Sequence, residues 1–146
     1  MADNMAPDEP LSSEQVTGQV QYWLDLADYD LETGRAMLAS GRLLYVAFMC
    51  HQTVEKALKA LYADRRRATP PRIHGLVALA QKAGAHAEMS PAQQDCLEAL
   101  DPMNIECRYP AEKGKLLAAL TPASCGTMLA ETEELLAWLR QKLSST

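Results

Sequence analysis

The stretch YVAFMCHQTVEKALKALYA, residues 45–63, decides the fold of this chain. Its apolar side chains recur every three or four residues, which is the spacing of one face of an α-helix. The stripe runs through Leu44, Phe48, His51, Glu55, Leu58 and Tyr62. Glu55 therefore falls on the face that we expect to be buried, where a carboxylate is costly unless a cation or several donors meet it.

Helical periodicity extends in both directions from this stretch. Ser12 or Ser13 and the pair Ser40-Gly41 are typical of a helix start and a helix end, and Thr69-Pro70-Pro71 interrupts the pattern. The predicted helices cover residues 13–39, 42–66, 73–83, 91–100 and 122–142, with a helical turn at 115–120 and no clear period over 101–114. No stretch alternates in the manner of a strand, so the sequence predicts an all-α, up-and-down bundle of four to five helices.

Length and composition indicate one domain in a chain of 146 residues. We expect residues 1–12 to form a disordered acidic tail and residues 13–146 to form the domain. The four cysteines have no metal-binding spacing, and no cofactor motif is present, so we expect neither a metal nor a cofactor. The sequence has no signal peptide and no run long enough to span a membrane, which favours a cytoplasmic protein.

Charge is unevenly distributed in a chain whose formal net charge is −5. Only acids occur before Arg35, whereas the stretch 56–72 carries Lys56, Lys59, Arg65, Arg66, Arg67 and Arg72 against Asp64 alone. Such a basic cluster could receive a phosphate or an acidic partner, or it could be a solvated helix end favoured by the helix dipole.

The sequence suggests two partners for Glu55. Arg108, in the Arg108-Tyr109-Pro110 loop, could offer its planar guanidinium to the carboxylate and so fasten the loop to the second helix. His51, one turn before Glu55, could form a carboxylate–imidazole pair with it, and such a pair can act in general acid–base catalysis. Both contacts could equally be purely architectural.

These features together resemble the HEPN domains (higher eukaryotes and prokaryotes nucleotide-binding). The resemblance is carried by Gln52, Glu55, Lys56, Leu58 and Lys59, then His74 with Leu76, then Arg108-Tyr109-Pro110, and it spans about residues 22–139. It implies a helical bundle, frequently a homodimer, and in bacteria an association with a minimal nucleotidyltransferase encoded beside it.

Many HEPN relatives are ribonucleases with an Arg-x(4–6)-His motif, in which Arg stabilises the charge of the phosphorane and His moves a proton. This chain departs from them, because no His follows Arg108 at that spacing. The one formal match is Arg67 with His74, and Pro70 and Pro71 interrupt it. The catalytic candidates are therefore Arg67, His74 and Arg108.

Three functions remain open at this point. The first is a HEPN binding module that associates with a nucleotidyltransferase-like partner, a nucleotide or an RNA phosphate. The second is a metal-independent, toxin-like ribonuclease of a toxin–antitoxin pair, and the third is a structural homodimer without ligand. The expected binding residues are Gln52, Glu55, Lys56, Lys59, Arg67, Arg72, Arg108 and Tyr109.

Overall fold

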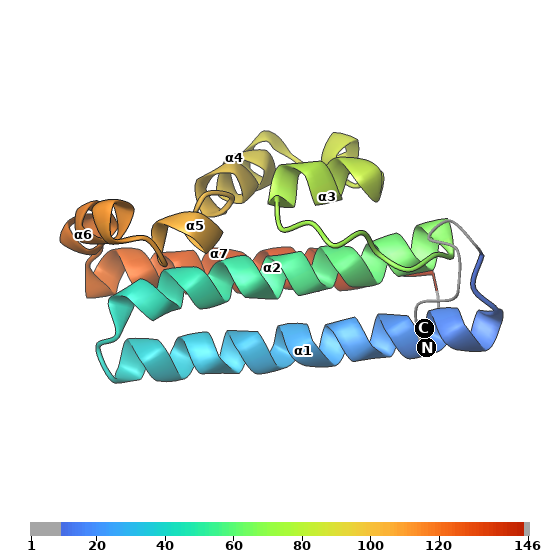
Figure 1. Ribbon diagram of the computed structural model, residues 1–146, viewed down its shortest axis with the longest axis horizontal. Coiled ribbons are helices and arrows are strands. Elements are labelled where there is room, and N and C mark those ends of the chain that lie inside the picture. The colour runs from blue at the N-terminus through green and yellow to red at the C-terminus, as the bar shows by residue number, and fades with distance from the viewer. Residues whose placement is uncertain (1–9, 145–146) are drawn as a thin grey trace.

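A long antiparallel helical hairpin forms the base of the structure (Figure 1). In this computed structural model, which describes residues 10–144, α1 (Ser13–Ala39) and α2 (Leu43–Arg66) pack along their whole length. The turn between them is short because Gly41 adopts a φ of 77°, a left-handed conformation that glycine reaches without steric cost. Ser12 caps α1 through a reciprocal capping box with Gln15. Both predicted long helices are confirmed.

The third long helix, α7 (Pro122–Gln141), packs against α2 and more lightly against α1. A second layer of short elements lies over α2 (Figure 1). It contains α3 (Leu76–Lys82), a 3-10 turn η2 (His86–Glu88), α4 (Pro91–Leu100), α5 (Met103–Glu106) and α6 (Pro110–Ala119). Residues 10–144 contain no strand, and the predicted all-α bundle is confirmed.

Two of the short helices begin at positions that differ from the prediction. α3 begins at Leu76 and not at residue 73, because the Asp101 carboxylate accepts the Leu76 backbone N–H at 2.6 Å and so caps the helix from the end of α4. Residues 73–75 are thereby left in the connecting segment. α6 begins at residue 110, earlier than the turn predicted at 115–120, and none of its described side chains is fully buried. An exposed helix has little apolar periodicity from which to predict it.

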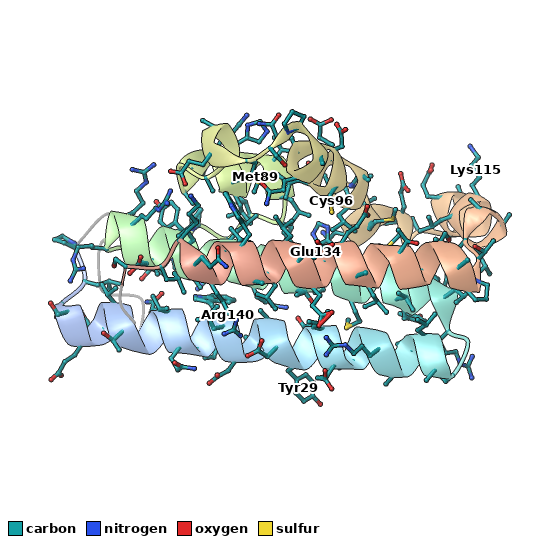
Figure 2. The ribbon with its side chains drawn as sticks, turned by 180° about the vertical axis from the view of Figure 1, so that it is seen from behind. Tyr29, Met89, Cys96, Lys115, Glu134 and Arg140 are labelled. Atoms are coloured by element: carbon teal, nitrogen blue, oxygen red, sulfur yellow. The ribbon has the colours of Figure 1, made fainter. Side chains whose placement is uncertain are left out.

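The core is centred on α2, whose buried face contacts every layer. Fully buried leucines from α2, α3, α4 and α7 meet there: Leu58, Leu61, Leu76, Leu79, Leu97, Leu135 and Leu139. On the reverse side, Arg140 of α7 reaches across to Asp28 of α1 (Figure 2). The two layers therefore enclose α2 and leave one of its polar edges beside the segment that leads to α3.

Both ends of the described chain are attached to the end of α2. The Leu11 backbone N–H donates to the Arg67 carbonyl at 2.9 Å, and Leu11 is itself buried. Ser144 donates from its backbone and its hydroxyl to Asp64 at 2.9 and 2.8 Å. Residues 1–9 of the expected tail lie outside the described residues. Across residues 10–144, no helix combines the length and the apolar character that a membrane crossing requires.

Candidate functional site

Glu55 lies inside the bundle, as its place on the apolar stripe predicts. Only 3% of its side chain is exposed, and three donors surround the carboxylate. Lys59 Nζ donates to Oε2 at 3.1 Å, His74 Nδ1 lies 3.1 Å from the same oxygen, and His51 Nε2 lies 3.3 Å from Oε1. We call these four residues the Glu55 cluster.

The electrostatics of the cluster keep this buried acid ionised. Burial by itself would raise the pKa of Glu55. The nearby His51, the hydrogen bond from His74, and the charge and hydrogen bond of Lys59 more than offset that effect and lower the pKa to about 2. Lys59 is held in turn by the ring of Trp23, whose centroid lies 5.2 Å from Nζ. The Glu55 carboxylate is therefore ionised at neutral pH.

His74 is the member of the cluster that faces solvent. It lies in the segment that runs back along α2 between α2 and α3 (Figure 1), and 60% of its side chain is exposed. Glu55 engages Nδ1, and Nε2 has no partner among the hydrogen bonds of residues 10–144. A buried carboxylate that orients an exposed imidazole in this way can support acid–base chemistry at the outer nitrogen.

The predicted pair between Arg108 and Glu55 is wrong. Arg108 lies in the turn between α5 and α6, and its Nε donates to the Asn104 carbonyl four residues earlier at 2.9 Å. Glu55 instead finds its cation one turn away on its own helix, at Lys59. A partner at i+4 is already in place when the helix forms, so no distant loop has to be ordered to meet the charge.

A chain of polar contacts links α1 to α5 along the edge of α2. Lys56 Nζ contacts Asp30 Oδ2 at 2.6 Å and Gln52 Oε1 at 3.1 Å. Gln52 Nε2 donates in turn to Asn104 Oδ1 at 3.3 Å, beside Arg108. Lys56 is therefore neutralised by Asp30, and Gln52 acts as a bridge between helices.

The remaining cations of the basic stretch do not form one surface. Arg65 pairs with Glu88 and also donates to the Ala83 and Gly84 carbonyls. Arg67, with a left-handed φ of 53°, ends α2 and donates to Ser13 Oγ at 3.1 Å. No hydrogen bond of residues 10–144 joins Arg67 to His74, so the sequence motif is not assembled into a contact.

Arg108 instead lines a hollow at the other end of α2, and the exposed Tyr109 follows it in the chain. The hollow has a volume of about 380 Å³ and is lined by Tyr45, Phe48, Cys107, Arg108 and Lys113. No carboxylate of the described chain lies within ion-pair distance of Arg108 or Lys113. We call it the α2–α6 hollow.

The walls of the α2–α6 hollow offer two kinds of contact. Tyr45 is 46% exposed, so an aromatic face is available to a planar ligand, and the two cations can meet an anion. Cys107 supplies a neutral wall, because burial raises the pKa of its thiol to about 11. Tyr45, Phe48 and Lys113 are not among the predicted site residues, although an exposed tyrosine on the polar edge of a core helix was a signal that could have found them.

The fold places the chain among the all-α helical bundles. A family model described as "HEPN domain" matches residues 20–142, and the chain belongs to this family. The fold is similar to the crystal structure of TT1696 from Thermus thermophilus. The TM-score is 0.73 at 22% identity, over 86% of this chain and 98% of that one. No curated protein matches the chain.

Proposed function

We propose that this protein is a HEPN binding module that holds a phosphate-bearing ligand, a nucleotide or one residue of an RNA strand, in the α2–α6 hollow. The observation that carries the proposal is the pairing of aromatic walls with two cations that no carboxylate of the described chain neutralises. A base can stack on Tyr45 or Phe48, while Arg108 and Lys113 meet the phosphate. Exposed Tyr109 stands next to Arg108 in the chain and extends the rim.

The size and charge of the hollow suit one nucleotide. A volume of about 380 Å³ falls in the lower part of the range of about 300–1,000 Å³ that is usual for small-ligand pockets. Arg108 uses Nε on the Asn104 carbonyl at 2.9 Å, and its Nη2 lies 3.5 Å from Asn104 Oδ1. The guanidinium is thus held in place from one side and can offer its other donors to phosphate oxygens.

Calorimetric titration with AMP, ATP and a short single-stranded RNA tests the proposal. We expect Arg108→Gln and Lys113→Gln each to weaken binding about tenfold, because each removes one charge-assisted contact of about 1.5 kcal/mol. The matched control is Lys82→Gln, which removes an exposed cation of α3 outside the hollow and leaves the affinity unchanged. Equal affinities for all variants would refute the assignment.

A second candidate, a metal-independent ribonuclease, is favoured by the Glu55–His74 contact. Glu55 fixes Nδ1 of His74, so Nε2 can accept the proton of a 2′-hydroxyl as its oxygen attacks phosphorus, while the P–O5′ bond breaks and the 5′-oxygen takes a proton from water. Arg72, exposed two residues earlier, is the cation on the same segment. RNA cleavage that is equal in wild type and His74→Ala would remove this candidate.

The family also supports a proposal about partners. We propose that the domain forms a homodimer and docks a minimal nucleotidyltransferase. Met37, Met103 and Met128 are only partly buried against the domain's own core, so part of each side chain is available to a second copy. Sedimentation velocity measures the dimer, and co-purification with the product of the adjacent gene measures the docking. A monomer at micromolar concentration would contradict the first part.

A further inference from the structure

His51 is the most deeply buried polar side chain of the Glu55 cluster, and none of its side chain is exposed. It reaches beyond its own helix in two directions. Nδ1 lies 2.9 Å from the Leu100 carbonyl at the end of α4, and Nε2 lies 3.1 Å from the His74 carbonyl. One imidazole therefore ties α2 to both the α4 terminus and the segment that carries His74.

The partners of His51 are all acceptors. Backbone carbonyl oxygens accept hydrogen bonds and cannot donate them, and Glu55 Oε1, 3.3 Å from Nε2, is a third acceptor. A neutral imidazole has one N–H and would leave the other nitrogen's lone pair facing a carbonyl oxygen inside the core. Only the imidazolium carries a proton on both nitrogens and satisfies both contacts.

We propose that His51 is a positioning residue, held as a buried imidazolium that fixes the backbone of His74 while Glu55 fixes its side chain. The two α2 residues stand one turn apart and so set both the place and the direction of the exposed imidazole of His74. The positioning of His74 by His51 rests on the second candidate function, the ribonuclease, for its purpose. The contacts that hold His74 are the same whether or not RNA is cleaved.

The charges around His51 are compatible with this state. Glu55 is the acid in contact, Lys59 lies on the far side of that carboxylate, and the His74 ring contacts Glu55 and not His51. From the end of α4, Asp101 is engaged by the Leu76 backbone N–H. The carboxylate of Glu55, with its pKa lowered to about 2 despite burial, supplies the counter-charge.

Nuclear magnetic resonance of the full chain labelled with ¹⁵N tests the inference directly, since the sequence has only three histidines. We expect long-range proton–nitrogen spectra at pH 7 to show protons on both ring nitrogens of His51. A His51 ring with one unprotonated nitrogen at pH 7 would overturn the proposal. This measurement uses wild-type protein and does not depend on a variant that folds.

A second measurement reports on the positioning of His74. Gln at residue 51 carries both of its N–H donors on one nitrogen and cannot place them where Nδ1 and Nε2 of His51 lie, so we expect His51→Gln to change the rate at which diethyl pyrocarbonate modifies His74. The expected change is about fivefold or more, which the loss of one hydrogen bond produces in an opening equilibrium. His86→Gln, on η2 and outside the cluster, is the matched control. An unchanged His74 rate in folded His51→Gln would show that His51 does not position it.

Discussion

The substitution Glu55→Gln removes the charge on which the Glu55 cluster depends. A pKa lowered from 4.5 to about 2 corresponds to about 3 kcal/mol of interaction that favours the ionised carboxylate in the folded protein. The variant also leaves Lys59, 8% exposed, and His51, fully buried, without a counter-charge. We therefore expect a loss of about 3–5 kcal/mol, the usual cost of removing one partner from a buried ion pair.

Urea and thermal denaturation followed by circular dichroism measure this loss. For a chain of this length, about 3–5 kcal/mol lowers the melting temperature by roughly 10 °C or more. The matched control is Glu133→Gln, which removes an exposed carboxylate paired with Arg35 and should cost at most about 1 kcal/mol. A Glu55→Gln protein that melts within the error of wild type would show that the Glu55 carboxylate does not stabilise the fold.

The pH dependence of the unfolding free energy should also show that ionised Glu55 stabilises the folded protein. Because the pKa of Glu55 is lower in the folded than in the unfolded chain, its stabilising effect is fully present above about pH 4.5 and is lost as the pH falls toward about 2. The stability difference between wild type and Glu55→Gln should therefore shrink across this window. A difference that stays constant from pH 7 to pH 2.5 would show that the carboxylate's charge is not its source.

Burial and capping lead to three more predictions. Leu58→Ala should lower the unfolding free energy by about 2–5 kcal/mol in urea titration, since the side chain is fully buried in the main core. Ser12→Ala should cost about 1 kcal/mol in the same assay through loss of the capping box, and a neutral result would count against it. A thiol reagent such as DTNB should label Cys96 before Cys50, because burial raises the pKa of Cys50 to about 12 and leaves none of it exposed. Faster labelling of Cys50 would contradict its place in the core.

The sequence was sufficient for the long helices because their signals are local. Ser12 and Thr121 both form capping boxes where the sequence predicts helix starts, and Gly41 turns the chain with a φ of 77°. The burial of Glu55 could also be predicted, since a helical stripe fixes which face each residue occupies. The predicted contact between His51 and Glu55 is confirmed at 3.3 Å for the same reason.

Contacts between distant segments could not be predicted in the same way. Arg108 and His74 are both polar residues near prolines, and periodicity does not indicate which of them meets Glu55. His74 meets Glu55 because Asp101 caps α3 at Leu76 and so leaves residues 73–75 to run along α2. The α2–α6 hollow was missed because it joins Tyr45 and Phe48 to side chains some 60 residues later, across helices whose packing no local pattern specifies.

A nitrogen–proton correlation spectrum of the labelled chain, recorded during titration with AMP, tests the proposed function most directly. We expect saturable shifts at the first two turns of α2 and across α5 and α6, with little change around His74, and loss of those shifts in Arg108→Gln. Shifts confined to the Glu55 cluster, or none at millimolar AMP and with single-stranded RNA alike, would rule out ligand binding in the α2–α6 hollow.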